Sequence, residues 1–126
     1  MSSALQIDYV EFPATDLNAV QAFYEAVFDT TLETIGDPTG EMQMRAFPTD
    51  LTHYGAGGAI SHTPHAKPGA GGTVIYFNCH DCAVEEARVA KSGGQVLRPK
   101  FSIGEFGFVS LCQDTEGNTF GLSSMK

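Results

Sequence analysis

Two segments of this chain, 65 positions apart, follow the same design, and this internal repeat limits the possible folds more than any other feature. Each segment has a strand-forming run, an aspartate suited to cap a helix, a helical pattern and a returning strand. The matching residues are Phe12 and Phe77, Asp16 and Asp81, Ala22 and Ala87, and Leu32 and Leu97. Because few identities remain, the shared order of elements is the stronger sign of duplication. A duplicated half-domain usually forms its ligand site where its halves meet.

The first segment predicts a strand over residues 6–12 and a helix that begins at Leu17. Strand alternation places Tyr9 and Glu11 on one face. Asp16 is a good N-cap, because its carboxylate can accept hydrogen bonds from the free amides of the first helical turn. We expect further strands over residues 32–35, 41–47 and the glycine-rich stretch 55–61.

The second segment predicts a strand over residues 73–79 and a helix that Asp81 caps and that ends near Gly93-Gly94. Three more strands are expected, over residues 95–99, 107–113 and 119–123. The order βαβββ therefore occurs twice, which predicts an α+β fold. We expect a single domain over residues 1–126, with module one at about 5–62, a linker at about 63–72 and module two at about 73–125.

Charge and composition exclude several classes of partner. The net charge is -8 with only seven scattered Lys and Arg residues, which disfavours nucleic acids and anionic membrane surfaces. No apolar run approaches the length that spans a bilayer, and the N-terminus lacks the features of a signal peptide. Three cysteines fit free thiols in a reducing compartment, so we expect a cytoplasmic protein.

Several motifs together carry a family resemblance. They are residues 10–17 (VEFPATDL), Ala22-Phe23-Tyr24 and Val27-Phe28 in the first half, and Tyr76-Phe77-Asn78, Asp81, residues 93–97 (GGQVL) and residues 114–122 (DTEGNTFGL) in the second. In this combination the chain resembles the vicinal oxygen chelate superfamily, also called the glyoxalase, bleomycin resistance protein and extradiol dioxygenase group. The resemblance implies two βαβββ modules forming a curled mixed sheet around a cup, with the helices on the outer face. It also implies a homodimer and, in many members, a divalent metal in the cup.

The resemblance places the family's metal ligands at Tyr9, Val74, Gly121 and approximately Gly58. Val and Gly side chains offer no donor atom, and a neutral Tyr is a poor ligand for Zn, Fe or Ni. We therefore expect no catalytic metal and no other cofactor.

Other side chains on the same strand faces are candidates for ligand binding. Alternation puts Glu11 beside Tyr9, and Tyr76 and Asn78 beside Val74, while Arg45 would be the natural partner of Glu11 if it points inward. Glu11 is the candidate general acid or base. The alternative is a structural Glu11 that only accepts hydrogen bonds within the fold.

The sequence thus predicts a glyoxalase-like protein that binds a small organic molecule in the cup, with catalysis undecided. One alternative is a divalent-metal-dependent lyase or dioxygenase with unusual ligands. Another is a non-catalytic, resistance-type protein that sequesters its ligand. Cys79 and Cys82 form a CxxC pair, but without a second pair a structural role is favoured over zinc binding.

Overall fold

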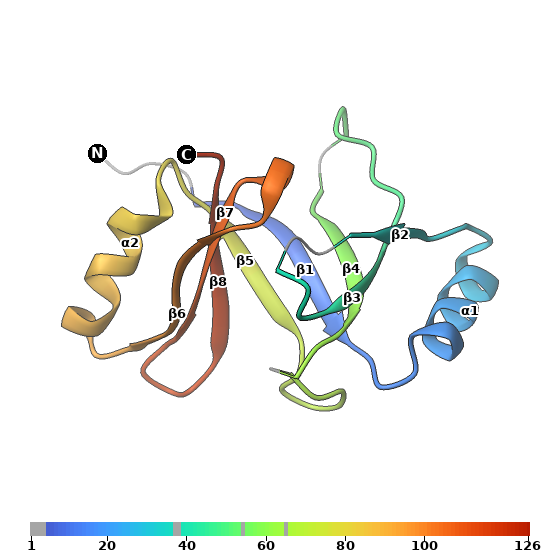
Figure 1. The fold of residues 1–126 in the computed structure, drawn as a ribbon, viewed down its shortest axis with the longest axis horizontal. Helices are drawn as coiled ribbons and strands as arrows, with labels where there is room; N and C mark the ends of the chain where they lie inside the picture. Colours follow the sequence, from blue (N-terminus) through green and yellow to red (C-terminus); the bar gives the residue numbers. More distant parts are fainter. Residues whose placement is uncertain (1–4, 37–38, 54, 65) are drawn as a thin grey trace. The chain divides into compact units, whose positions relative to one another are not determined.

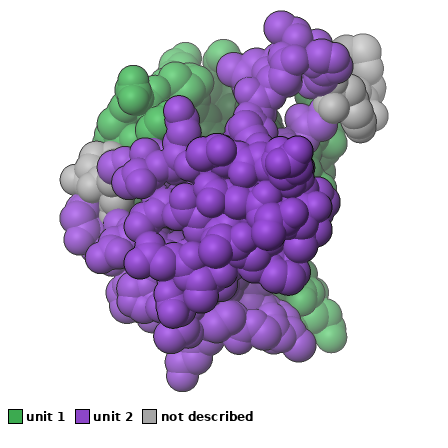
Figure 2. Space-filling model, turned by 90° about the vertical axis from the view of Figure 1, so that its right-hand side faces the viewer, with its two compact units in different colours: residues 1–8, 74–126 green, residues 9–73 purple. Residues whose placement is uncertain are grey.

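The computed structural model describes residues 5–36, 39–53, 55–64 and 66–126. The chain forms two compact units, with residues 5–8 and 74–126 in unit 1 and residues 9–73 in unit 2. Figure 1 labels their helices and strands, and Figure 2 shows the surface of unit 2 in purple. Each module has the order βαβββ, so the α+β class and the duplicated order of elements are confirmed.

Unit 2 contains a mixed sheet and the longer α-helix of the described chain. Its elements are β1 (Ile7–Pro13), α1 (Leu17–Phe28), β2 (Glu33–Ile35), β3 (Gln43–Ala46) and β4 (Gly57–His62). The strand order is β2-β3-β4-β1, with β1 and β4 parallel and the other pairs antiparallel. The first two residues of β1 belong to unit 1, so this strand runs from one unit into the other.

Helix α1 begins and ends where the local sequence predicts. The carboxylate of Asp16 accepts a hydrogen bond from Ala19 N at 3.1 Å. At the other end Asp29 adopts a left-handed conformation (φ 50°), which closes the last turn. The helix packs on Ile60 and Leu32 at the centre of the unit 2 core.

Unit 1 repeats the plan with a shorter helix. Its elements are β5 (Val74–Asn78), α2 (Cys82–Val89), the 3₁₀ turn η1 (Ala90–Ser92), β6 (Gln95–Ser102), the 3₁₀ turn η2 (Gly104–Phe106), β7 (Phe108–Gln113) and β8 (Thr119–Ser124). The strand order is β5-β8-β7-β6, with β5 and β8 parallel. Gly93 follows η1 with a φ of 98°, the left-handed conformation expected of a C-cap glycine.

The strand registers of the two modules correspond. Glu11 pairs with Ala59 in the β1–β4 ladder, and Tyr76, 65 positions after Glu11, pairs with Gly121 in the β5–β8 ladder. The chain leaves each ladder through the same hydrogen bond, from Ala14 N to Ser61 O and from Cys79 N to Ser123 O, both at 2.7 Å. The repeat therefore extends to the pairing of individual residues, and Ser61 occupies in unit 2 the place of Ser123 in unit 1.

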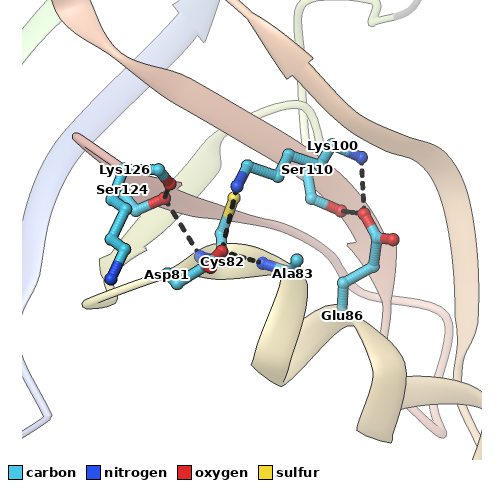
Figure 3. A network of polar contacts seen from close by, with 8 residues as sticks. All are labelled: Asp81, Cys82, Ala83, Glu86, Lys100, Ser110, Ser124 and Lys126. Carbon is cyan, nitrogen blue, oxygen red and sulfur yellow. Dashed lines mark hydrogen bonds and ion pairs between the residues drawn. The ribbon is translucent and has the colours of Figure 1, made fainter.

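Helix α2 is anchored to a bulged edge strand. Arg98 lies opposite Leu111 and Phe101 opposite Val109, so β6 has one more residue than β7 in this interval. The bulge removes the amide of Lys100 from the ladder. Glu86 Oε1 accepts from this amide and from Ser110 Oγ, the latter at 2.8 Å (Figure 3).

The N-terminus of α2 is fixed by two side chains. Asp81 Oδ1 accepts from Ala83 N at 3.0 Å and from Lys100 Nζ at 2.9 Å, and Ser124 Oγ accepts from Cys82 N at 3.0 Å (Figure 3). The hydrogen bond and charge of Lys100, with the Ala83 amide, hold the pKa of Asp81 below its ordinary value of 3.8. In the described part of the chain, no helix has the length and apolar content that crossing a membrane requires.

Replacing Glu86 with Ala should lower the free energy of unfolding by about 1–3 kcal/mol, because the bulge amide of Lys100 and the hydroxyl of Ser110 lose their shared acceptor. Urea unfolding followed by circular dichroism measures this change. The matched control is Glu105→Ala on exposed η2, which should leave the midpoint nearly unchanged. Equal stability of Glu86→Ala and wild type would contradict the anchoring role.

The stabilisation by Asp81 should depend on pH in a defined direction. Because its folded-state pKa is lowered, its contribution is complete above the ordinary carboxyl pKa of 3.8 and is lost as the pH falls through the lowered value. We expect Asp81→Asn to reduce the stability difference between pH 6 and pH 2, measured by thermal unfolding. Hydrogen bonds with Asn118 and Glu116 also lower the pKa of Asp114, so this carboxylate should stabilise the fold over the same pH range. Asp114→Asn should therefore reduce the stability difference between pH 6 and pH 2 as well.

Candidate functional site

A buried carboxylate lies on the sheet of unit 2, on the face that sequence alternation assigned to Tyr9 and Glu11. Glu11 is 7% exposed and belongs to the central part of β1. Its Oε2 accepts from the hydroxyl of Tyr9 at 3.1 Å, and its Oε1 accepts from Ser61 Oγ at 3.0 Å. Tyr9 and Glu11 share a face because they are two residues apart on one strand. Ser61 reaches the same carboxylate from β4, two residues beyond Ala59, the register partner of Glu11.

This arrangement fixes the position of both carboxylate oxygens. A hydroxyl donor to a charged acceptor stabilises by roughly 1.5–3 kcal/mol, which offsets part of the cost of burying the charge. A carboxylate held this way can accept a hydrogen bond from a ligand or exchange a proton with it.

The corresponding position in unit 1 holds an aromatic ring. Tyr76 is 7% exposed and its ring lies over Gly121, so that a Cβ at position 121 would overlap its Cδ2 and Cε2 atoms. Val74, the preceding residue on this face of β5, is also buried. The last-strand position at which the family resemblance implies a metal ligand is therefore covered by the Tyr76 ring.

Asn78 is part of a second polar group within unit 1. Its Nδ2 donates to Asp8 Oδ2 at 2.9 Å, and Ser123 Oγ donates to the same oxygen at 2.8 Å. Asn78 was predicted from strand alternation, whereas Asp8 and Ser61 were not. The offset of 65 positions would match Ser61 with Lys126, so its correspondence to Ser123 follows only from the strand registers, in which Ser61 pairs with Pro13 and Ser123 with Asn78.

Arg45 does not join the Glu11 group. It pairs with Ile60, whose neighbour Ala59 lies on the Glu11 face, so Arg45 lies on the other side of the sheet. There its Nε donates to Gln21 Oε1 of α1 at 3.0 Å. The inward direction considered for Arg45 is therefore wrong. The direction of its side chain depends on how β3 pairs with β4, and the sequence of the short strand β3 does not specify this pairing.

Gly58 also lies on the far face from Glu11. It pairs with Val10, and a Cβ there would meet Phe47 of the α1-facing core at 3.3 Å. The residues of β4 that share a face with Glu11 are Gly57, Ala59 and Ser61. The metal-ligand position expected approximately at Gly58 therefore does not lie on the Glu11 face, whereas its neighbour Ala59 does.

The donor atoms at these positions do not fit a divalent metal. Tyr9, Val74 and Gly121 supply one phenol between them, and no group of three His, Cys, Asp or Glu side chains with metal-binding spacing occurs among the residues that the structure describes. Burial, with Glu85 nearby, raises the pKa of Cys79 to about 12, so this thiol stays protonated. Among the described residues, Cys79 and Cys82 belong to no group of three potential metal ligands, so the structure supplies no further zinc ligands beside this pair.

Comparison with known proteins gives the family. A model of the Glyoxalase/Bleomycin resistance protein/Dioxygenase superfamily matches residues 6–122, and the chain belongs to this superfamily. A glyoxylase-like domain-containing protein of Didymella fabae is 29% identical over 124 residues, which cover 93% of this chain and 91% of that protein.

Solved structures of similar fold include two methylmalonyl-CoA epimerases. The enzyme of Streptomyces coelicolor, in complex with 2-nitronate-propionyl-CoA, has a TM-score of 0.68 at 16% identity, covering 94% of this chain and 93% of that one. The enzyme of Mycobacterium tuberculosis has a TM-score of 0.69 at 10% identity, covering 95% and 87%. A hypothetical protein of Bacillus halodurans has a TM-score of 0.70 at 12% identity, covering 98% and 96%. At these identities the likeness shows the fold alone.

Gly121→Ala should destabilise the protein by roughly 1–3 kcal/mol, because the added methyl group overlaps the Tyr76 ring. In a Tyr76→Ala background the same substitution should cost much less, since the obstructing ring is gone. Chemical denaturation of the four proteins of this double-mutant cycle measures the coupling. Additive effects would show that the ring does not occupy this space.

Proposed function

We propose that this chain binds a small organic molecule through the Glu11 carboxylate, and that it does so without the divalent metal of many superfamily members. The observation that carries the proposal is the buried Glu11, held between the hydroxyls of Tyr9 and Ser61. A fold that buries a carboxylate and fixes both of its oxygens provides a preorganised acceptor for a ligand donor group.

The donor chemistry at the family's ligand positions supports a metal-free site. Val74 and Gly121 contribute no lone pair, and the Tyr76 ring covers Gly121. A divalent cation requires several nitrogen, oxygen or sulfur donors at short distance. Organic recognition by hydrogen bonds and apolar contact requires only what these residues supply.

Charge favours a neutral or cationic ligand over an acyl-CoA. The structural relatives from Streptomyces coelicolor and Mycobacterium tuberculosis are methylmalonyl-CoA epimerases. The phosphates of coenzyme A are anionic, whereas this chain has a net charge of -8. Arg45 is engaged with Gln21, and Lys100 with Asp81, so neither cation is presented to a ligand.

The proposal extends to assembly and location. A homodimer is proposed on the family resemblance, and a cytoplasmic location on the free thiols of Cys79, Cys82 and Cys112. Native mass spectrometry reports the subunit number directly.

Protein purified without chelator or affinity metal should carry divalent metal well below one ion per chain, measured by plasma mass spectrometry.

A library of neutral and cationic metabolites, screened by native mass spectrometry, should identify an organic ligand. The affinity for this ligand should fall at least about tenfold in Glu11→Gln, because a charged hydrogen-bond acceptor is lost. Glu105→Gln, at an exposed position, is the matched control. Stoichiometric Ni, Zn, Fe or Mn in the purified protein would overturn the proposal that the site works without a metal.

The same variant separates binding from acid–base chemistry once a ligand that turns over is known. If Glu11 transfers a proton, Glu11→Gln abolishes kcat as well as weakening binding. Unchanged kcat with raised KM would assign Glu11 to ligand binding alone.

A further inference from the structure

The two oxygens of the Glu11 carboxylate lie in different surroundings. Oε1 accepts from the hydroxyl of Ser61, a side chain that is only 1% exposed. Oε2 accepts from the hydroxyl of Tyr9, which is half-buried. Ala59, the register partner of Glu11, is fully buried, so the β4 side of the carboxylate is closed to a ligand. The Tyr9 side is therefore the one from which a ligand reaches Glu11.

The backbone of Ser61 is fixed from both sides. Its strand β4 lies between β1 and β3, and Ser61 pairs with Pro13 on one side and with Met44 on the other. Its carbonyl oxygen also accepts from Ala14 N at 2.7 Å, at the end of the parallel ladder. Because a serine hydroxyl oxygen is placed by a single side-chain torsion, little conformational entropy is lost in holding it against the carboxylate.

Unit 1 uses the corresponding serine in the same way. Ser123 Oγ donates to Asp8 Oδ2 at 2.8 Å, as Ser61 Oγ donates to Glu11 Oε1 at 3.0 Å. In both modules the serine of the last strand thus donates to a carboxylate, although the two acids occupy different positions. The register of the parallel ladder therefore places the hydroxyl donor, whichever acid accepts from it.

The hydroxyl of Tyr9 determines what kind of ligand fits on its side. A phenol has a single hydrogen, and in Tyr9 this hydrogen is directed to Glu11 Oε2. Toward a ligand, the phenol oxygen and Oε2 therefore act as acceptors. A ligand that meets them supplies N–H or O–H donors, and the charge of the carboxylate strengthens hydrogen bonds from a cation.

We propose that Ser61 is a positioning residue of this site: by holding Oε1 it directs Oε2 and the Tyr9 hydroxyl oxygen toward a ligand with N–H donors, such as an amidinium. This role rests on the proposed binding by Glu11. Ser61 itself does not touch the ligand. Its hydroxyl fixes the rotation of the carboxylate about its last side-chain torsion, which is otherwise broad, so without the hydroxyl the carboxylate can turn away from Tyr9.

Crystal structures of the wild type and of Ser61→Ala test the positioning role without any ligand. We expect the carboxylate plane of Glu11 to rotate by at least about 30° in Ser61→Ala, because Oε1 has lost its donor. Ser61→Thr keeps the hydroxyl and should retain the wild-type orientation. Ser123→Ala is the matched control, because it removes the corresponding hydroxyl of unit 1 and leaves Ser61 in place.

Acetamidinium chloride, titrated into ¹⁵N-labelled protein, measures the consequence for binding. The Kd for acetamidinium should rise at least about threefold in Ser61→Ala, because the acceptor oxygens are no longer held in place. Ser61→Thr should recover the affinity, and Ser123→Ala should bind as the wild type does.

An unchanged carboxylate plane in Ser61→Ala overturns the positioning role, and so does equal affinity of the wild type and Ser61→Ala for acetamidinium. A wild type that binds no acetamidinium overturns the ligand class. If threonine does not fold at this buried position, Ser61→Ala and its Ser123→Ala control decide the question. The carboxylate plane can stay unchanged while Glu11 still binds a ligand, and it can rotate while Glu11→Gln shows that Glu11 binds none, so the two proposals fail separately.

Discussion

The parallel pairing of the first and last strand of each module is the constraint on which the candidate site depends. In the β1–β4 ladder it sets Glu11 opposite Ala59, and in the β5–β8 ladder it sets Tyr76 opposite Gly121. A slip of one residue in either ladder would move every side chain of that strand to the other face. The hydrogen bonds that end the two ladders, at Ser61 O and Ser123 O, show that both modules keep the same register.

Within this shared frame the two modules have diverged in chemistry. The same strand position carries a carboxylate in unit 2 and an aromatic ring in unit 1, and each needs a particular neighbour. Glu11 requires a hydroxyl donor, which Ser61 supplies, and the Tyr76 ring requires the space that Gly121 leaves. Superfamily membership thus fixes the scaffold, while the side chains on it decide whether a metal can bind.

Both helices are joined to the following strand by a glutamate. In unit 2, Glu25 Oε2 accepts from Leu32 N at 2.8 Å, and this backbone hydrogen bond lowers the pKa of Glu25. In unit 1, Glu86 accepts from the bulge amide of Lys100. In each case a helix carboxylate satisfies a backbone amide that the sheet does not pair. The helices are therefore held by directed polar contacts as well as by the apolar cores beneath them.

The sequence alone determined the order of elements, the α+β class, the capping roles of Asp16 and Asp81 and the shared face of Tyr9 and Glu11, because these depend on local propensity and on alternation along one strand. Only the tertiary structure decided that Arg45 turns to Gln21, that Gly58 faces Phe47, and that Ser61 and Asp8 join polar groups. Those outcomes depend on the register between strands far apart in the chain, which alternation within one segment does not specify.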